Sequence, residues 1–176
     1  MTLCIQLISD LPKGNIWRGY VIQLARDPDL DSEFDTCTSD IRHLPDDEFF
    51  DQLMHRGYNG ILFFLHHTEP QKKLDEGMPI GGIFWQEHRY NNTTVWRVFR
   101  LLVNDNFRNQ GYGCKQVAIF LRYAHERAIK TIFLGNGGDQ IVRHIFEKIH
   151  TGEITLPFPI RCDPQRYTIS FSYIAP

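Results

Sequence analysis

The most constraining feature of this sequence is a long apolar strand that leads through a glycine-containing loop into an amphipathic helix. The run TTVWRVFRLLVN at 93–104 carries apolar residues on both faces, so we expect a central strand covered on both sides. Over 113–130, apolar residues recur at helical spacing from Val117 to Ala128. The segment therefore predicts a strand, a loop and a helix in direct succession.

The loop between this strand and this helix reads Arg108-Asn109-Gln110-Gly111-Tyr112-Gly113. Its two glycines lie at the helix start, where backbone N–H groups point outward with no Cβ in the way. These N–H groups and the positive end of the helix dipole suit a pyrophosphate, and Arg108 adds a positive charge. The loop matches neither the GxxxxGK[ST] nor the GxGxxG phosphate-binding pattern.

The remaining segments alternate between helical and strand patterns. Helical spacing predicts helices over 15–26, 45–56 and 139–149. Apolar runs predict strands over 60–67, 78–88, 131–135 and 166–174. Hairpin connections favour antiparallel pairing from 60 to 104, whereas the helix before 131–135 favours a parallel pair there. We expect one α+β domain over residues 1–176, with a mixed, mostly antiparallel central sheet flanked by helices.

Composition excludes several classes of protein. The formal net charge of −2 argues against a nucleic-acid partner held by phosphate contacts. The longest apolar runs, such as 61–65, are far too short to span a membrane, and the first fifteen residues show no signal peptide. The 4 cysteines form no CxxC pair, which argues against a thiolate metal site and fits a reducing compartment. We expect a cytoplasmic protein without a metal.

In this order, the strand, the Arg-x-x-Gly-x-Gly at 108–113 and the helix resemble motif A of the GCN5-related N-acetyltransferase (GNAT) superfamily. The segment TIFLGN at 131–136, followed by IVRHIFEKI at 141–149, resembles that superfamily's next strand, asparagine and helix. The match covers residues 95–150 and extends in strand order from about 59 to 174. The resemblance implies a three-layer GNAT-like fold whose parallel strand pair splays apart at an acyl-CoA site.

The resemblance also implies how acetyl-CoA, or another acyl-CoA, is held. The pantetheine arm would pair with the strand at 101–103, and the pyrophosphate would bind the N–H groups of 109–113. A backbone N–H near Val103 would stabilise the oxyanion. The implied cofactor-binding residues are Leu101, Leu102, Val103, Arg108, Asn109, Gln110, Gly111, Tyr112, Gly113, Asn136 and Phe146.

The chain departs from the superfamily's pattern at two chemical positions. Phe146 stands where a tyrosine often protonates the leaving sulfur, and a shifted register would offer only His144 or His150 instead. Arg97 stands where some members carry a glutamate base. A base is needed because an amine with a pKa near 10 is only about one part in a thousand neutral at pH 7.

The best-placed substitutes for the base are Glu87 and His88, at the end of the strand that precedes the motif A strand. A solvated strand end is the simpler interpretation of both. Arg97 and Arg100, three apart on one strand, are expected on opposite faces. One of them could meet an acceptor carboxylate or phosphate, although an ion pair with Glu87 or stacking on a tryptophan is the simpler explanation.

The remaining reactive side chains point to no separate chemistry. His66 and His67 are adjacent on a strand and face opposite sides, so they cannot share one metal ion. Cys114 lies at a helix N-terminus, where a thiolate is stabilised, but the sequence identifies no histidine partner for it. Cys162 has the same difficulty. We expect both cysteines to be spectators.

The sequence thus predicts an N-acyltransferase, most simply an acetyltransferase, in which an amine attacks acetyl-CoA directly in a ternary complex. The amine, a small molecule or a protein, is not specified. The acidic residues of 27–35 and 46–48 suit a cationic acceptor or, equally, a solvated surface. A homodimer is left open. The alternatives are a catalytically degenerate member that binds acyl-CoA as a sensor or scaffold, and a protein-contact domain that binds no CoA.

Overall fold

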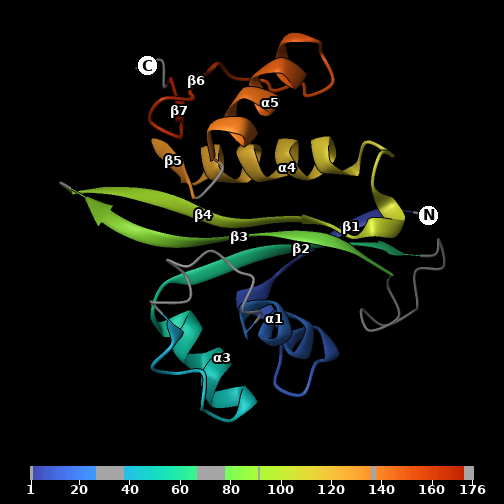
Figure 1. The fold of residues 1–176 in the computed structure, drawn as a ribbon, viewed down its shortest axis with the longest axis vertical. Coiled ribbons are helices and arrows are strands. Elements are labelled where there is room, and N and C mark those ends of the chain that lie inside the picture. Colours follow the sequence, from blue (N-terminus) through green and yellow to red (C-terminus); the bar gives the residue numbers. More distant parts are fainter. Residues whose placement is uncertain (1, 27–37, 67–77, 91, 136–137, 173–176) are drawn as a thin grey trace.

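A mixed β-sheet runs through the part of the chain that the computed structural model describes, residues 2–26, 38–66, 78–90, 92–135 and 138–172 (Figure 1). Within these residues the strand order is β1-β2-β3-β4-β5-β7-β6. Neighbouring strands pair antiparallel except β4 and β5, which are parallel. The strands are β1 (Thr2–Leu7), β2 (Tyr58–His66), β3 (Met78–Tyr90), β4 (Thr93–Val103), β5 (Thr131–Leu134), β6 (Ile160–Asp163) and β7 (Thr168–Phe171).

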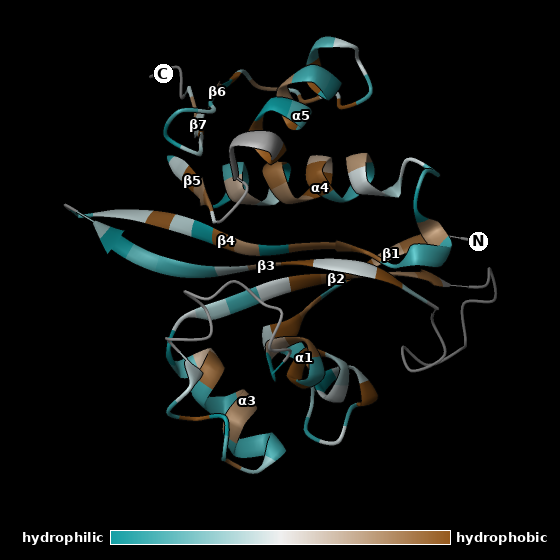
Figure 2. Ribbon diagram, viewed as in Figure 1, coloured by the Kyte–Doolittle hydropathy of each residue, from teal (hydrophilic) through white to brown (hydrophobic). Residues whose placement is uncertain are grey.

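Helices cover both faces of the sheet (Figure 1). The helices α1 (Ile16–Arg26) and α3 (Asp46–His55) lie on one face, and α4 (Tyr112–Glu126) and α5 (Gly138–His150) lie on the other. Figure 2 shows apolar residues along α4 and along the strands next to it, with polar residues on the outer parts of α3. Two short 3₁₀ helices, η1 (Ile8–Asp10) and η3 (Asp105–Phe107), join strands to helices. This architecture confirms the predicted α+β fold, a mostly antiparallel sheet flanked by helices.

Two edge strands were not predicted from the sequence. β1 and β6 lie at the two edges of the described sheet. Their segments are short and carry no long apolar run, so their extended conformation depends on pairing with β2 and β7 rather than on their own pattern. The other strands and helices lie close to their predicted positions. The helix α4 ends at Glu126 rather than Lys130, and Ala128 takes a left-handed conformation with φ 56°.

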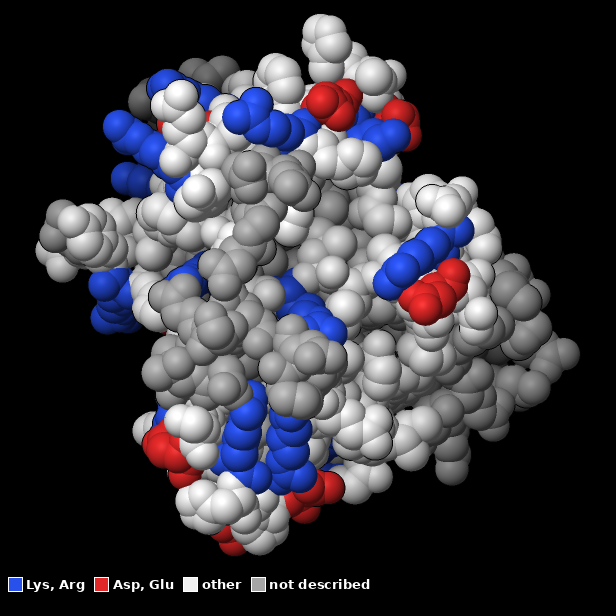
Figure 3. All heavy atoms as spheres, in the orientation of Figure 1, with Lys and Arg blue, Asp and Glu red and all other residues white. Residues whose placement is uncertain are grey.

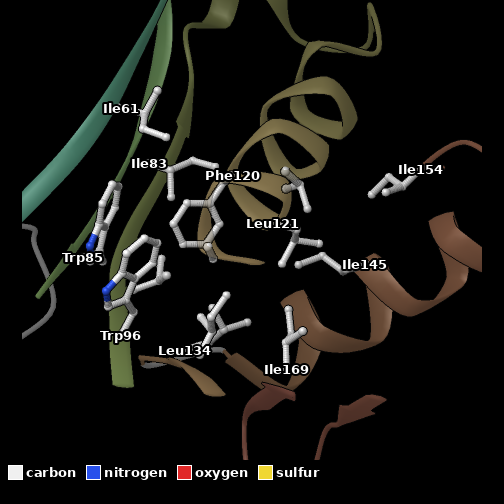
Figure 4. Packing of buried hydrophobic residues seen from close by; sticks show 14 of the residues in the cluster. Ile61, Ile83, Trp85, Trp96, Phe120, Leu121, Leu134, Ile145, Ile154 and Ile169 are labelled. Carbon is white, nitrogen blue, oxygen red and sulfur yellow. The ribbon is translucent and has the colours of Figure 1, made fainter. Parts of the chain in front are cut away.

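The larger core cluster lies between the sheet and the α4/α5 layer. Trp85 of β3 and Trp96 of β4 are both 0% exposed and stack with ring centroids 4.6 Å apart. Phe120 of α4 packs on both rings, at 5.3 and 5.7 Å, and Figure 4 shows Leu121 beside it, toward Ile145 of α5. This packing holds α4 against β3 and β4, and it therefore positions the N-terminal end of α4 relative to the end of β4.

A bulge in β4 changes which residues share a face. The register pairs Trp85 with Val98 but Phe84 with Arg100, so Phe99 is an extra residue on β4. Each extra residue shifts the alternation of side chains by one. Leu101 and Val103 consequently face the α4/α5 layer together with Val98, whereas Phe99 and Leu102 pack in the α1/α3 cluster. A strand without this bulge would place Phe99 on the same face as Leu101 and Val103.

A buried arginine joins α1 to α3. The side chain of Arg18 is 8% exposed and donates hydrogen bonds to Asp47 at 2.9 Å and to Asp51 at 2.8 Å. Its guanidinium lies over the ring of Phe50, 4.0 Å from the centroid. The hydrogen bond from Arg18 holds the pKa of Asp51 below its usual range. The two helices on this face are thus held together by ionic contacts as well as by apolar packing.

Arg18→Met should lower the melting temperature at neutral pH by about 4–8 °C, corresponding to roughly 2 kcal/mol, because the variant keeps the apolar stem but loses both hydrogen bonds. A carboxyl with a lowered folded-state pKa stabilises the fold above its unfolded pKa and loses that contribution as the pH falls through the folded pKa. The difference in melting temperature between Arg18→Met and the natural protein should therefore be smaller at about pH 2–3 than at neutral pH. Thermal denaturation of both proteins at the two pH values measures it. A difference that stays equal at both would contradict the role of the ion pair.

Candidate functional site

The strands β4 and β5 pair only over a short stretch. Their parallel register runs from Val95–Thr131 to Val98–Leu134, and the N–H of Gly135 then donates to the Val98 carbonyl at 3.0 Å. Among the described residues, no strand pairs with this edge of β4 over 101–103. The backbone of β4 therefore continues past its parallel neighbour with one edge available for other hydrogen bonds, as the predicted splayed pair requires.

A cavity of ≈ 880 Å³ lies beside this part of β4. Its walls come from the end of β4, the connection through η3 into α4, the inner side of α5 and the segment after α5. The lining residues are Leu101, Val103, Phe107, Arg108, Asn109, Gly111, Gly113, Cys114, Val117, Ile141, His144, Ile145, Lys148, Glu153 and Ile154. The structure thus brings residues 101–113 and 141–154 together around one space.

The N-terminus of α4 opens onto this cavity. Gly111 is the N-cap residue and takes a left-handed conformation with φ 77°. A Cβ added there would meet nothing within 4 Å, and a Cβ at Gly113 would lie 3.6 Å from Val103 Cγ2. The first turn of the 15-residue helix carries no acidic residue. Exposed N–H groups, the helix dipole and the bare glycine backbone together make this end of the cavity suited to an anion.

Within 101–113, three of the predicted cofactor-binding residues have side chains that do not line the cavity. Leu102 packs in the α1/α3 cluster on the other face of the sheet because of the bulge. Gln110 is exposed and its Nε2 donates to the Asn106 carbonyl at 2.9 Å. Tyr112 packs edge-on against Phe107, with ring centroids 5.7 Å apart. Any contact of these residues with a ligand in the cavity would therefore come from the backbone.

Charged side chains flank the cavity on two sides. Arg108 forms an ion pair with Asp105 at 2.8 Å, and Lys148 of α5 forms one with Glu153 at 2.7 Å. The hydrogen bond to Glu153 raises the pKa of Lys148, so this side chain stays cationic at neutral pH. On the face of the molecule drawn in Figure 3, basic and acidic side chains are mixed rather than gathered into one patch.

The helix α5 presents a different residue to the cavity from the one that the sequence indicated. Phe146 is 56% exposed, stacks on His150 with centroids 6.4 Å apart, and is absent from the cavity wall. The side of α5 that lines the cavity carries Ile141, His144, Ile145 and Lys148, and Phe146 lies about 100° from Ile145 in the direction away from that side. The placement of Phe146 beside a thioester is corrected accordingly. His144, named above only as a substitute, lines the cavity.

Phe146→Tyr should change neither the melting temperature nor any acyl-transfer rate by a measurable amount. The added hydroxyl would meet solvent, so it neither loses hydrogen bonds on folding nor reaches the cavity. Differential scanning fluorimetry and a steady-state rate are sufficient measurements. A clear gain in rate would show that Phe146 enters the site after all, and a marked loss of stability would show that it is buried.

Glu87 and His88 lie at a separate place. They line a second cavity of ≈ 340 Å³ with His55, Arg56, Gly57, Arg89 and Thr94, and this cavity shares no lining residue with the larger one. Glu87 accepts a hydrogen bond from Trp96 Nε1 at 3.1 Å. It is four residues, or roughly 13 Å, along β3 from the residue that pairs with Leu101. Both residues are exposed toward the end of β3, and their role as the base stays a prediction.

The two candidate cysteines differ in their surroundings. Cys114 lines the larger cavity, and His144, which the sequence could not identify as a neighbour, lines it too. Burial raises the pKa of Cys162 to about 11, so this thiol is protonated at neutral pH, which fits the spectator role expected for it. The sequence could not show that Cys114 and His144 line the same cavity, because 29 residues lie between them and they belong to different helices.

Several predicted features lie outside the described residues. These are Asn136, His67 and the acidic segment 27–35. Within the described ranges, no three histidine, cysteine, aspartate or glutamate side chains gather as a metal site would require. None of the described helices combines the length and the apolar composition needed to cross a membrane.

Solved structures share this architecture at low sequence identity. The chain is similar to an acetyltransferase of the GNAT family from Streptococcus pneumoniae, with a TM-score of 0.53 and 16% identity over 91% of this chain and 86% of that one. It is also similar to an acetyltransferase from Trypanosoma brucei, with a TM-score of 0.51 and 12% identity over 92% of this chain and 99% of that one. No family model matches the chain, and no curated protein matches its sequence.

Proposed function

The chain has the fold of the GCN5-related N-acetyltransferases, and from this fold and its cavity we propose that it is an acyl-CoA-dependent N-acyltransferase, most simply an acetyltransferase. The observation that carries the proposal is the ≈ 880 Å³ cavity, which joins the edge of β4 to the N-terminus of α4. A coenzyme with a long amide-containing arm and a pyrophosphate needs both features in one continuous space. We further propose that residues 1–176 act as one domain, and the scattered thiols support a cytoplasmic location.

The residues at hand fit the coenzyme. The available edge of β4 at Leu101 and Val103 would pair with the amides of the pantetheine arm as an added strand does. The N–H groups around Gly111 and Gly113 would hold the pyrophosphate, with the Arg108 guanidinium at the rim. Apolar side chains from α4 and α5, such as Val117 and Ile145, would cover the arm.

The position of Val103 changes the expected place of the chemistry. Val103 lies beside Gly113, at the pyrophosphate end of the cavity. An extended pantetheine arm that starts there would carry its thioester back along β4 toward the bulge at Phe99. We therefore propose that backbone N–H groups at Phe99 or Arg100, rather than at Val103, stabilise the oxyanion formed when the amine attacks the thioester.

The reaction also needs two proton transfers, which must be carried out by side chains that face the cavity or by water. The amine loses a proton as it attacks, and the departing thiolate gains one. Since Glu87, His88 and Phe146 lie away from the cavity, we propose His144 as the group on its wall that can protonate the sulfur. Water that reaches the bulge from the α1/α3 face would serve as the base.

A thiol-release assay with acetyl-CoA and a panel of primary amines tests the proposal. Release of CoA that depends on an amine, together with a mass increase of one acetyl group on that amine, is the expected result. Calorimetry with CoA is run in parallel. Absence of both CoA binding and a CoA-induced thermal shift would reject the proposed function and leave the protein-contact domain as the explanation.

A second candidate function is favoured by one observation. Glu87, His88 and Phe146 do not line the larger cavity, so fewer groups suited to acid–base chemistry face it. A protein that binds acyl-CoA as a sensor or scaffold needs the cavity but not those groups. Micromolar binding of CoA without thiol release for any amine would support this alternative. Amine-dependent release that falls in His144→Gln at an unchanged dissociation constant would support the enzyme.

A further inference from the structure

Two arginines of β4 lie on the same face of the sheet. Arg97 precedes the bulge and Arg100 follows it, so the extra residue Phe99 brings side chains three positions apart onto one side. Arg100 pairs with Phe84, which belongs to the α1/α3 cluster, and Arg97 faces away from its buried neighbours Trp96 and Val98. This corrects the expectation that the two guanidiniums point to opposite faces.

The two arginines bracket the point at which β4 and β5 separate. The parallel ladder ends at Val98–Leu134, between Arg97 and Arg100 in the sequence. The larger cavity lies on the opposite face, lined by Leu101 and Val103 of the same strand. If the proposed function holds, the coenzyme occupies that cavity on one face of β4, which leaves the α1/α3 face for the approach of the amine. The amine would then approach beside the two guanidiniums.

The surroundings of Arg100 are rich in aromatic and apolar groups. Arg100 lines a narrow cavity of ≈ 20 Å³ whose wall includes Leu24, Tyr58 and Phe99. Burial raises the pKa of Tyr20 in α1, and the positive charge of Arg100 offsets part of that rise. A guanidinium next to apolar groups binds an oxyanion more strongly than one in bulk water does, because the local dielectric constant is lower.

We propose that the acceptor is an amine that also carries an oxyanion, a carboxylate or a phosphate, and that Arg100 binds this oxyanion while Arg97 adds positive charge. The inference rests on the proposed function and specifies its substrate class. A guanidinium offers two parallel N–H donors that match both oxyanions. The same positive charge disfavours polyamines and other acceptors with a second cation near the amine.

Pairs of acceptors that differ only in the anion test this proposal. Suitable pairs are an amino acid with its carboxamide and an amino-sugar phosphate with the free amino sugar, and a polyamine is added as a cationic acceptor. We expect kcat/KM to be at least about tenfold higher for the anionic member of at least one pair, with the pair revealing whether carboxylate or phosphate is preferred. Equal values in both pairs, or a preference for the polyamine, would overturn the proposal.

Variants of the two arginines show which of them is responsible for the preference for anionic acceptors. Arg100→Gln should remove the preference for the anion through a higher KM, Arg100→Lys should retain part of it, and Arg97→Gln should lower it less. The dissociation constant for CoA should stay unchanged in all three, because both side chains lie on the face opposite the larger cavity. If Arg100→Gln lowers kcat/KM equally for both members of a pair, Arg100 does not bind the anion.

The outcome is distinguishable from failure of the proposed function. If CoA does not bind at all, the proposed function fails. If CoA binds but no amine is acetylated, the same pairs are titrated by calorimetry into the protein saturated with CoA. Tighter binding of the anionic member, lost in Arg100→Gln, would support the inference without turnover, whereas equal or absent binding of both members would overturn it.

Discussion

Gly111→Asp should lower the affinity for acyl-CoA by at least about 100-fold and leave the fold intact. Gly111 is the N-cap of α4 and lines the larger cavity, so a carboxylate there would lie against the proposed pyrophosphate position. The new Cβ would meet nothing within 4 Å, and aspartate tolerates a left-handed φ of 77° better than most residues. The strain cost of about 1 kcal/mol is too small to unfold the protein.

Gly111→Asn is the matched control for this prediction. Asparagine has the shape of aspartate and the same tolerance for the left-handed conformation, but it carries no charge. It should therefore weaken binding much less than Gly111→Asp does. Isothermal titration calorimetry with CoA, after circular dichroism has confirmed folding, measures both variants. An unchanged dissociation constant in Gly111→Asp would move the site away from the N-terminus of α4.

Gly81→Ala should destabilise the protein by about 3 kcal/mol or more, enough to prevent folding in a marginally stable domain. A Cβ at Gly81 would overlap the carbonyl oxygen of Leu102 and lie 2.8 Å from its carbonyl carbon. Both atoms belong to the backbone of β4, so no side-chain rotation can relieve the overlap. The two strands would have to separate where β4 also forms the wall of the larger cavity.

Gly19→Ala provides the contrast. Gly19 lies inside α1, and an added Cβ would meet nothing within 4 Å. The same substitution should therefore stabilise the protein, by about 0.5–1 kcal/mol, through helix propensity. Urea denaturation of both variants gives the two free energies of unfolding. Similar stabilities for Gly81→Ala and the natural protein would mean that β3 and β4 are further apart at this point than the structure has them.

The sequence was sufficient to predict most of the fold, because most helices and strands show a characteristic pattern in consecutive residues. Apolar runs and turn residues marked β2 to β5, and helical spacing marked α1, α3, α4 and α5. The order of strand, glycine loop and helix at 95–130 also predicted where the N-terminus of α4 lies, and the family resemblance that it carries implied that β4 and β5 separate. Edge strands β1 and β6 were missed since their order depends on neighbours that are remote in sequence.

The sequence predicted only the part of the candidate site that is formed by residues close together in the chain. Six predicted residues within 101–113 line the larger cavity, because one strand and one loop carry them all. Its other wall comes from α5 and the segment after it. Which side of α5 turns inward depends on how the helix packs on the sheet, and a helical pattern that includes both Ile145 and Phe146 leaves about 100° of rotation open. In the packed structure Val142 and Ile145 are buried, Phe146 is exposed, and His144 lines the cavity.

The sequence by itself thus determined the strand–loop–helix order and the glycine-containing N-terminus of α4, since both depend on consecutive residues. The tertiary structure alone decided the direction of Arg100, because a single extra residue in β4 reverses the alternation that a sequence pattern assumes. It also decided that Glu87 and His88 line a cavity that shares no residue with the larger one, because the position of a strand residue relative to a helix layer depends on how the elements pack.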